Sequence, residues 1–181
     1  MFNKIIITLI YFYSISNCFA GTEFPVNFLL QADITPLAAG FKIESVAVLP
    51  NKLTVRYEEG DERFRDINAQ LVIDTNIPKD RTGSFYYDIN LVDNEASCIL
   101  NNGNIINYES PTLAITNNVG DFVNITNENP IVWQKFSDTI SETKASIRDV
   151  NISFSKIPLL DFMNSYKSCN GKMTLMVGLS I

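Results

Sequence analysis

Apolar and polar side chains alternate along residues 24–34 with a period of two. Six apolar side chains fall on every second position, and a mostly polar set occupies the positions between them. Because successive side chains of a strand point to opposite faces, the pattern predicts an extended strand with one apolar face. The residues of that face are Phe24, Val26, Phe28, Leu30, Ala32 and Ile34.

The same period-two pattern recurs along most of the chain. Its segments are 52–57, 67–74, 85–91, 113–115, 123–125, 150–154 and 173–181. Clusters of turn-forming residues separate them, at 59–61, 78–80, 101–104, 117–120 and 127–130. Seven or eight short strands with such turns predict an all-β fold, an antiparallel β-sandwich. The apolar face of the last strand consists of Met173, Leu175, Val177, Leu179 and Ile181.

Two segments depart from this pattern. Within 134–148, the residues Phe136, Ile140, Thr143 and Ile147 are spaced by three to four positions, which predicts a short helix or an irregular excursion. The other candidate helix is 159–166, which follows Pro158. Neither segment is long enough to change the fold class.

The first 20 residues have the layout of a secretory signal peptide. One lysine precedes an apolar stretch that ends at the small residue Ala20, and the stretch is too short for a membrane span. Lipid attachment at Cys18 is an alternative, but Asn17 stands where a smaller residue is expected before such a cysteine. Removal of the signal peptide leaves 161 residues, which is the size of a single domain.

Charge and cysteine content narrow the function further. The net charge of −6 argues against nucleic acid or an anionic membrane surface as a partner, since both require clustered Lys and Arg. Cys98 and Cys169 remain after removal of the signal peptide, and an even pair in a secreted domain predicts a disulfide. Two independent buried thiols are the alternative.

Catalytic chemistry finds little support in the sequence. The chain has no histidine, which excludes Ser-His-Asp and Cys-His arrangements and metal sites built on imidazole. The acidic run at 58–62 is followed by Arg63 and Arg65, so we expect a solvated turn there. We therefore expect no enzymatic activity and no cofactor. Trp133 is either a residue at the edge of the core or part of a surface on which carbohydrate stacks.

The first strand allows two interpretations. It is an ordinary first strand of a self-contained sandwich, or it detaches and completes the sheet of another molecule. Thr35-Pro36 and the small-residue stretch 37–40 follow it, which would let it move as a unit. The pattern alone does not decide between these interpretations.

Three stretches of the chain add a family resemblance. They are 26–36 (VNFLLQADITP), 48–60 (VLPNKLTVRYEEG) continuing through Phe64, and 172–181 (KMTLMVGLSI). The first resembles an N-terminal donor segment and its following turn, the second a first core strand and turn, and the third a terminal strand. The family is the alternate-chaperone (alpha) class of bacterial chaperone–usher fimbriae, which includes colonisation factor antigen I and the common pilus of enterobacteria.

The resemblance implies an immunoglobulin-like sandwich that lacks its final strand. In this family the N-terminal segment of the next subunit fills the open groove, after a periplasmic chaperone has occupied it and an outer-membrane usher has catalysed the exchange. The domains would be a signal peptide (1–20), a donor-strand extension (21–36) and a pilin sandwich (37–181). The apolar face of 24–34 would be the donor, and that of 173–181 would edge the acceptor groove and meet the chaperone.

The resemblance also implies partners and a location. Identical or related fimbrial subunits, the chaperone and the usher would be partners, and a host receptor stays open because shaft subunits can also adhere. The chain would be secreted through the periplasm to the cell surface. The alternative function is a self-contained secreted β-sandwich that binds a glycan or a protein.

Overall fold

The alternating segments form strands in the computed structural model, which describes residues 23–24, 40–50, 53–157 and 165–180. All strand pairs in this part of the chain are antiparallel. The strands are β1 (Glu23–Phe24), β2 (Ile43–Leu49), β3 (Val55–Glu58), β4 (Arg63–Phe64), β5 (Ile67–Pro78), β6 (Tyr86–Leu100), β7 (Ile105–Asn107), β8 (Thr112–Thr116), β9 (Phe122–Ile125), β10 (Ile131–Lys135), β11 (Asp138–Ile140), β12 (Thr143–Ser153) and β13 (Tyr166–Ser180). The all-β, antiparallel prediction is confirmed.

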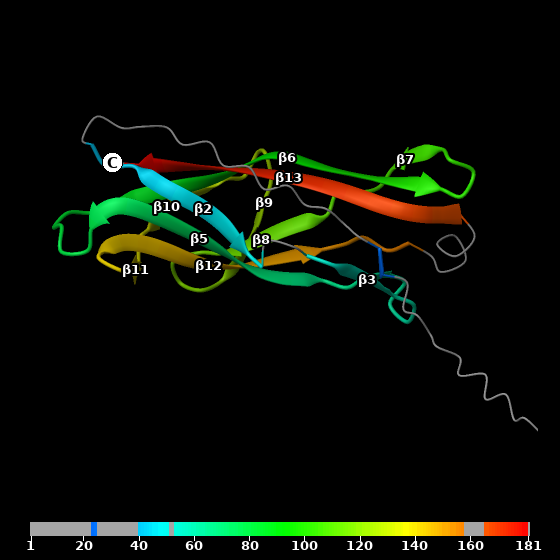
Figure 1. The fold of residues 1–181 in the computed structure, drawn as a ribbon, viewed down its shortest axis with the longest axis horizontal. Coiled ribbons are helices and arrows are strands. Elements are labelled where there is room, and N and C mark those ends of the chain that lie inside the picture. The colour runs from blue at the N-terminus through cyan, green and yellow to red at the C-terminus, as the bar shows by residue number, and fades with distance from the viewer. Residues whose placement is uncertain (1–22, 25–39, 51–52, 158–164, 181) are drawn as a thin grey trace, which may run out of the picture.

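Two sheets form the body of the elongated molecule (Figure 1). One has the strand order β2-β5-β12-β8-β9, with β11 also paired to β12. The other has the order β10-β6-β13, with β7 also paired to β6. A small sheet of β1, β3 and β4 lies at one end, near β7. The two large sheets share one core, as expected of a β-sandwich.

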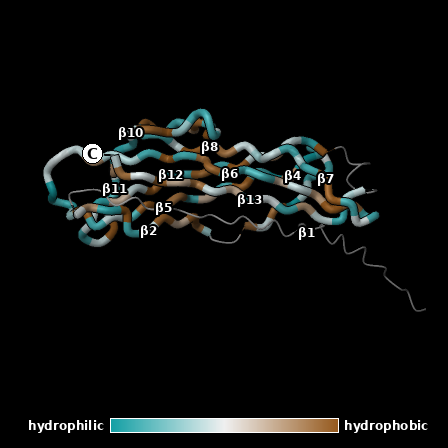
Figure 2. Tube along the Cα trace, turned by 90° about the horizontal axis from the view of Figure 1, so that it is seen from above, coloured by the Kyte–Doolittle hydropathy of each residue, from teal (hydrophilic) through white to brown (hydrophobic). Residues whose placement is uncertain are grey.

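The core follows from the period of two. On β5, the residues at every second position from Ile67 to Ile77 are buried, and both large sheets contribute to a single buried cluster. Figure 2 shows hydrophobic and hydrophilic residues alternating along strands such as β5 and β12. At the end of the molecule near β3, the ring of Phe64 packs edge-on against the rings of Tyr57, Tyr108 and Phe154.

A buried arginine ties the two sheets together. Arg148 on β12 is 7% exposed, and its Nε donates to the hydroxyl of Tyr87 on β6 at 2.8 Å. Its Nη1 donates to the carbonyl of Asn117 at 3.0 Å. Its Nη2 donates to Asn118 Oδ1 at 2.9 Å and to the carbonyl of Lys135 at 3.0 Å. The side chain therefore joins β12, β6, the β8–β9 turn and the end of β10.

The helix predicted within 134–148 is wrong. These residues form the end of β10, then β11 and the first half of β12. Ser141 has a φ of 55°, and this left-handed residue reverses the chain between β11 and β12. The other candidate helix, 159–166, lies outside the described residues except for 165 and 166. Of these two, Tyr166 is the first residue of β13.

Candidate functional site: two sheet edges

β13 forms one edge of its sheet. It pairs with β6 from Tyr166 to Ser180, and no other strand of the described residues pairs with it. From Met173 onward, its core-facing side chains are buried and are those predicted from the alternation: Met173, Leu175, Val177 and Leu179. An edge strand presents backbone N–H and C=O groups that can pair with an additional strand.

β2 forms the corresponding edge of the other sheet. Within the described residues it pairs only with β5. β2 and β13 approach within 8 Å between Cα atoms, although they belong to different sheets. Figure 1 shows the two strands beside each other near the C-terminal end and diverging away from it. The edges of both sheets therefore meet on one side of the sandwich, and this pair of edges is the candidate site.

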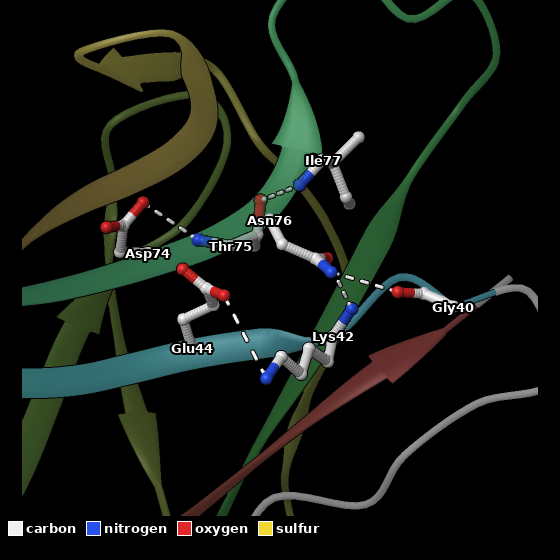
Figure 3. Close-up of polar contacts among 7 residues, drawn as sticks. All are labelled: Gly40, Lys42, Glu44, Asp74, Thr75, Asn76 and Ile77. Carbon is white, nitrogen blue, oxygen red and sulfur yellow. Dashed lines mark hydrogen bonds and ion pairs between the residues drawn. The ribbon is translucent and has the colours of Figure 1, made fainter.

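Asn76 fixes the chain where it enters β2 (Figure 3). Its Oδ1 accepts a hydrogen bond from the Lys42 backbone N–H at 2.7 Å, and its Nδ2 donates to the Gly40 carbonyl at 2.9 Å. The Asn76 backbone N–H also donates to the Lys42 carbonyl at 3.2 Å. Gly40 has a φ of 75°, a conformation that favours glycine. The side chain of Asn76 thus sets the point at which the chain leaves residues 1–39 and joins the sheet.

Replacing Asn76 by alanine is expected to lower the free energy of unfolding by about 1 kcal/mol, because two hydrogen bonds to the backbone are lost. Urea unfolding followed by circular dichroism measures the change. The matched control is Asn68→Ala, which removes an exposed side-chain hydrogen bond to Asn151 and is expected to change stability much less. Equal losses in both variants would contradict the anchoring role of Asn76.

Most of the predicted donor face lies outside the described residues. Phe24 lies in β1, opposite Val55 of β3. The other five donor positions, Val26 to Ile34, lie outside the described residues, as does Ile181 at the end of the acceptor face. The assignment of the donor strand therefore stays a prediction.

The disulfide prediction is confirmed. Cys98 and Cys169 are bonded, and they face each other as a cross-strand pair of β6 and β13. The alternative of two independent thiols is wrong. On the same ladder, Lys172 Nζ lies 2.8 Å from Asp93 Oδ2, and this hydrogen bond raises the pKa of Lys172. At the Cys98 end of the sheet, burial raises the pKa of Tyr108 to about 12, and its hydroxyl donates to the Ser155 carbonyl.

The remaining candidates are scattered over the molecule. The acidic run at 58–62 forms the turn between β3 and β4, as expected. Among the described residues, no group of three or more histidine, cysteine, aspartate or glutamate side chains could hold a metal ion. Trp133 lies in β10, which β6 separates from the β13 edge, and its side chain is exposed.

Sequence reasoning missed β2, Asn76 and Arg148. The strand has a bulge between Ile43 and Ser45, where the register against β5 shifts, so its apolar residues do not alternate strictly. The sequence did contain a signal for Arg148. In the alternating segment 143–153 this arginine lies an even number of positions from Val150 and Ile152, so it faces the core with them.

No helix of the described residues is long and apolar enough to cross a membrane. Comparison with protein-family models gives no match for the chain, and comparison with curated proteins gives none either.

Proposed function

We propose that the chain is a structural subunit of a surface fimbria that polymerises by N-terminal donor-strand exchange. The observation that carries the proposal is the edge of β13, whose core-facing residues are apolar and whose outer edge has no partner strand among the described residues. The adjacent edge of β2 would receive the other side of the incoming segment. The predicted strand at 24–34 supplies a segment with a matching apolar face.

The strand order supports the same proposal. An immunoglobulin sandwich has strands A, B, E and D in one sheet and C, F and G in the other. β2, β5, β12 and β8 follow the order of A, B, E and D, while β6 and β13 take the places of C and F. No described strand stands in the place of G beside β13. One departure is β10, which pairs with the other edge of β6 although it follows β8 and β9 in sequence.

The energetics of such a contact favour a durable fibre. Burial of a large apolar side chain contributes about 1.5–3 kcal/mol, and the donor face offers four or five of them. Main-chain hydrogen bonds along the edge add about 1 kcal/mol each. Before assembly the same edge would leave backbone N–H and C=O groups without a partner strand, so a periplasmic chaperone and an outer-membrane usher belong to the proposal. The location that follows is the cell surface.

The test compares the full secreted chain with a variant that lacks residues 21–35. We expect the full chain to form SDS-resistant multimers, and the shortened chain to fold only when a synthetic peptide of residues 23–35 is added. Folding is followed by circular dichroism and assembly by unheated SDS gels. The control peptide carries Phe28→Asp and Leu30→Asp, and it is expected to give no folding because it cannot bury an apolar face.

A full chain that stays monomeric and unfolds cooperatively would contradict polymerisation. If the deletion also abolished its folding, the first strand would belong to its own sheet. That result favours the alternative function, a self-contained secreted binding module.

A further inference from the structure

Trp133 adopts a strained backbone conformation at an exposed position. Its φ is 56°, in the left-handed region that a bulky residue rarely occupies. It lies in a bulge of β10, where the register against β6 shifts between Ile131 and Gln134. The side chain is 59% exposed, so burial of the indole does not account for the conformation. Such strain persists where the surroundings over-determine it, and it concentrates at functional sites.

Four hydrogen bonds impose this conformation. The Trp133 N–H donates to Asp88 Oδ1 at 2.7 Å, and the Trp133 carbonyl accepts from Asn118 Nδ2 at 3.3 Å. The backbone N–H of Lys135, two residues further along, donates to Asn118 Oδ1 at 3.0 Å. Buried Arg148 holds the same Oδ1 at 2.9 Å. The bulge is therefore clamped from β6 on one side and from the β8–β9 turn on the other.

The surface beside Trp133 spans three neighbouring strands, β10, β6 and β13. We call this surface the shelf, and it includes Tyr86, Asp88 and Gly178. The ring of Tyr86 packs edge-to-face with the indole, at 5.5 Å between centroids. Asp88 Oδ2 accepts a hydrogen bond from Ser180 Oγ at 2.6 Å, which fixes both carboxylate oxygens. Opposite Asp88 on β13 stands Gly178, and a Cβ added there would meet no atom within 4 Å.

Gly178 has no conformational reason to be glycine, because it lies within a strand and its φ is not in the left-handed region. Glycine weakens a strand interior and often marks a place where a ligand approaches closely. Gly178 is the cross-strand partner of Asp88, so the open space at Gly178 lies on the strand next to this carboxylate. Each carboxylate oxygen has two acceptor sites, so one on each oxygen is left after the bonds to Trp133 and Ser180.

We propose that Trp133, Asp88 and Gly178 form a binding site for a neutral hexopyranose. The C–H face of the sugar stacks on the exposed indole, its hydroxyls donate to Asp88, and the far side of the ligand extends over Gly178 on the next strand. Trp and Tyr provide an apolar face beside polar groups, which suits a ligand of this mixed character. The carboxylate and the net charge of −6 disfavour an anionic sugar. The inference is independent of the proposed polymerisation.

Intrinsic fluorescence tests this site directly, because Trp133 is the single tryptophan of the chain. The full chain is titrated with lactose, maltose, methyl mannoside and 3′-sialyllactose. We expect a saturable change in emission with at least one of the three neutral sugars, and a weaker response to sialyllactose. No saturable change with any neutral sugar overturns the proposal, and so does binding of sialyllactose alone.

Two variants separate binding from folding. Gly178→Thr adds a strand-forming side chain into open space, so thermal stability should be kept while the affinity for the sugar falls at least about tenfold. Asp88→Asn retains the acceptor for the Trp133 amide but loses the carboxylate, and a similar loss of affinity is expected. The control is Ile105→Ser at the far end of the same sheet, where the side chain is 70% exposed. Unchanged affinity in Gly178→Thr, or an equal loss in the control, overturns the site.

Discussion

Removal of the disulfide, by Cys98→Ala together with Cys169→Ala, is expected to lower the free energy of unfolding by about 4 kcal/mol. The two residues are 71 positions apart, so the bond excludes a large set of extended conformations from the unfolded chain. Both side chains are also buried, and the small cavity left by the sulfur atoms adds to the loss. Equilibrium unfolding in urea, followed by the fluorescence of Trp133 and by circular dichroism, measures the difference.

Chemical reduction supplies the control for this experiment. The wild-type chain unfolded in the presence of a thiol reductant should approach the midpoint of the double alanine variant, whereas the reductant should leave the variant unchanged. A loss below about 1 kcal/mol would mean that the unfolded chain gains little freedom when the bond is absent. That result would contradict the predicted contribution.

Replacement of Arg148 by methionine is expected to lower the free energy of unfolding by about 3 kcal/mol. Methionine fills much of the same volume, so the loss measures the hydrogen bonds rather than the packing. The change removes the buried hydrogen bond to the Tyr87 hydroxyl and the three bonds to Asn118 Oδ1 and to the carbonyls of Asn117 and Lys135. A hydrogen bond made by a charged group contributes about 1.5–3 kcal/mol. Urea unfolding again measures the effect.

Arg65→Met is the matched control for Arg148→Met. The Arg65 side chain is 73% exposed, and its Nε lies 3.7 Å from Glu58 Oε1. An exposed ion pair of this kind contributes less than about 1 kcal/mol, so little change is expected. Similar losses in the two variants would show that Arg148 does not tie the sheets together.

The alternation of apolar residues was enough to predict the all-β fold class and the positions of the main strands. β5, β6 and β13 lie where the period-two segments 67–74, 85–91 and 173–181 predicted strands, because one face of each packs on the shared core. β6 extends well beyond its predicted end, to Leu100. Past Leu91 the register against β13 shifts, and this irregularity breaks the alternation in the sequence.

The spacing of apolar residues at 134–148 gave a wrong helix prediction, and the reason is physical. Phe136, Ile140 and Ile147 resemble one face of a helix, yet they lie in the β10–β11 connection, in β11 and in β12. Ile147 is 42% exposed, so it does not share a buried face with the others. A few apolar residues three to four positions apart cannot distinguish a helix from short strands joined by tight turns.

The candidate sites were predictable to different degrees. The cysteine pair and the apolar face of β13 followed from composition and alternation. The adjacency of β2 and β13 did not, because it depends on how two sheets pack. The shelf at Trp133 was equally out of reach, since a left-handed tryptophan and the clamp from Asn118 arise only from tertiary contacts.

The position of the disulfide also bears on how the protein folds. The β6–β13 ladder pairs residues far apart in sequence, 71 positions at the cysteines and more towards Ser180. Pairing over such separations is intrinsically slow, because the entropy of closing a long loop is lost before any contact between the strands stabilises the pair. Once the cysteines are oxidised, that loop is already closed. Each further residue pair towards Ser180 then requires the closure of only a short additional loop. Folding would then proceed from the covalent end of the ladder, so the Met173–Leu179 edge would be completed last.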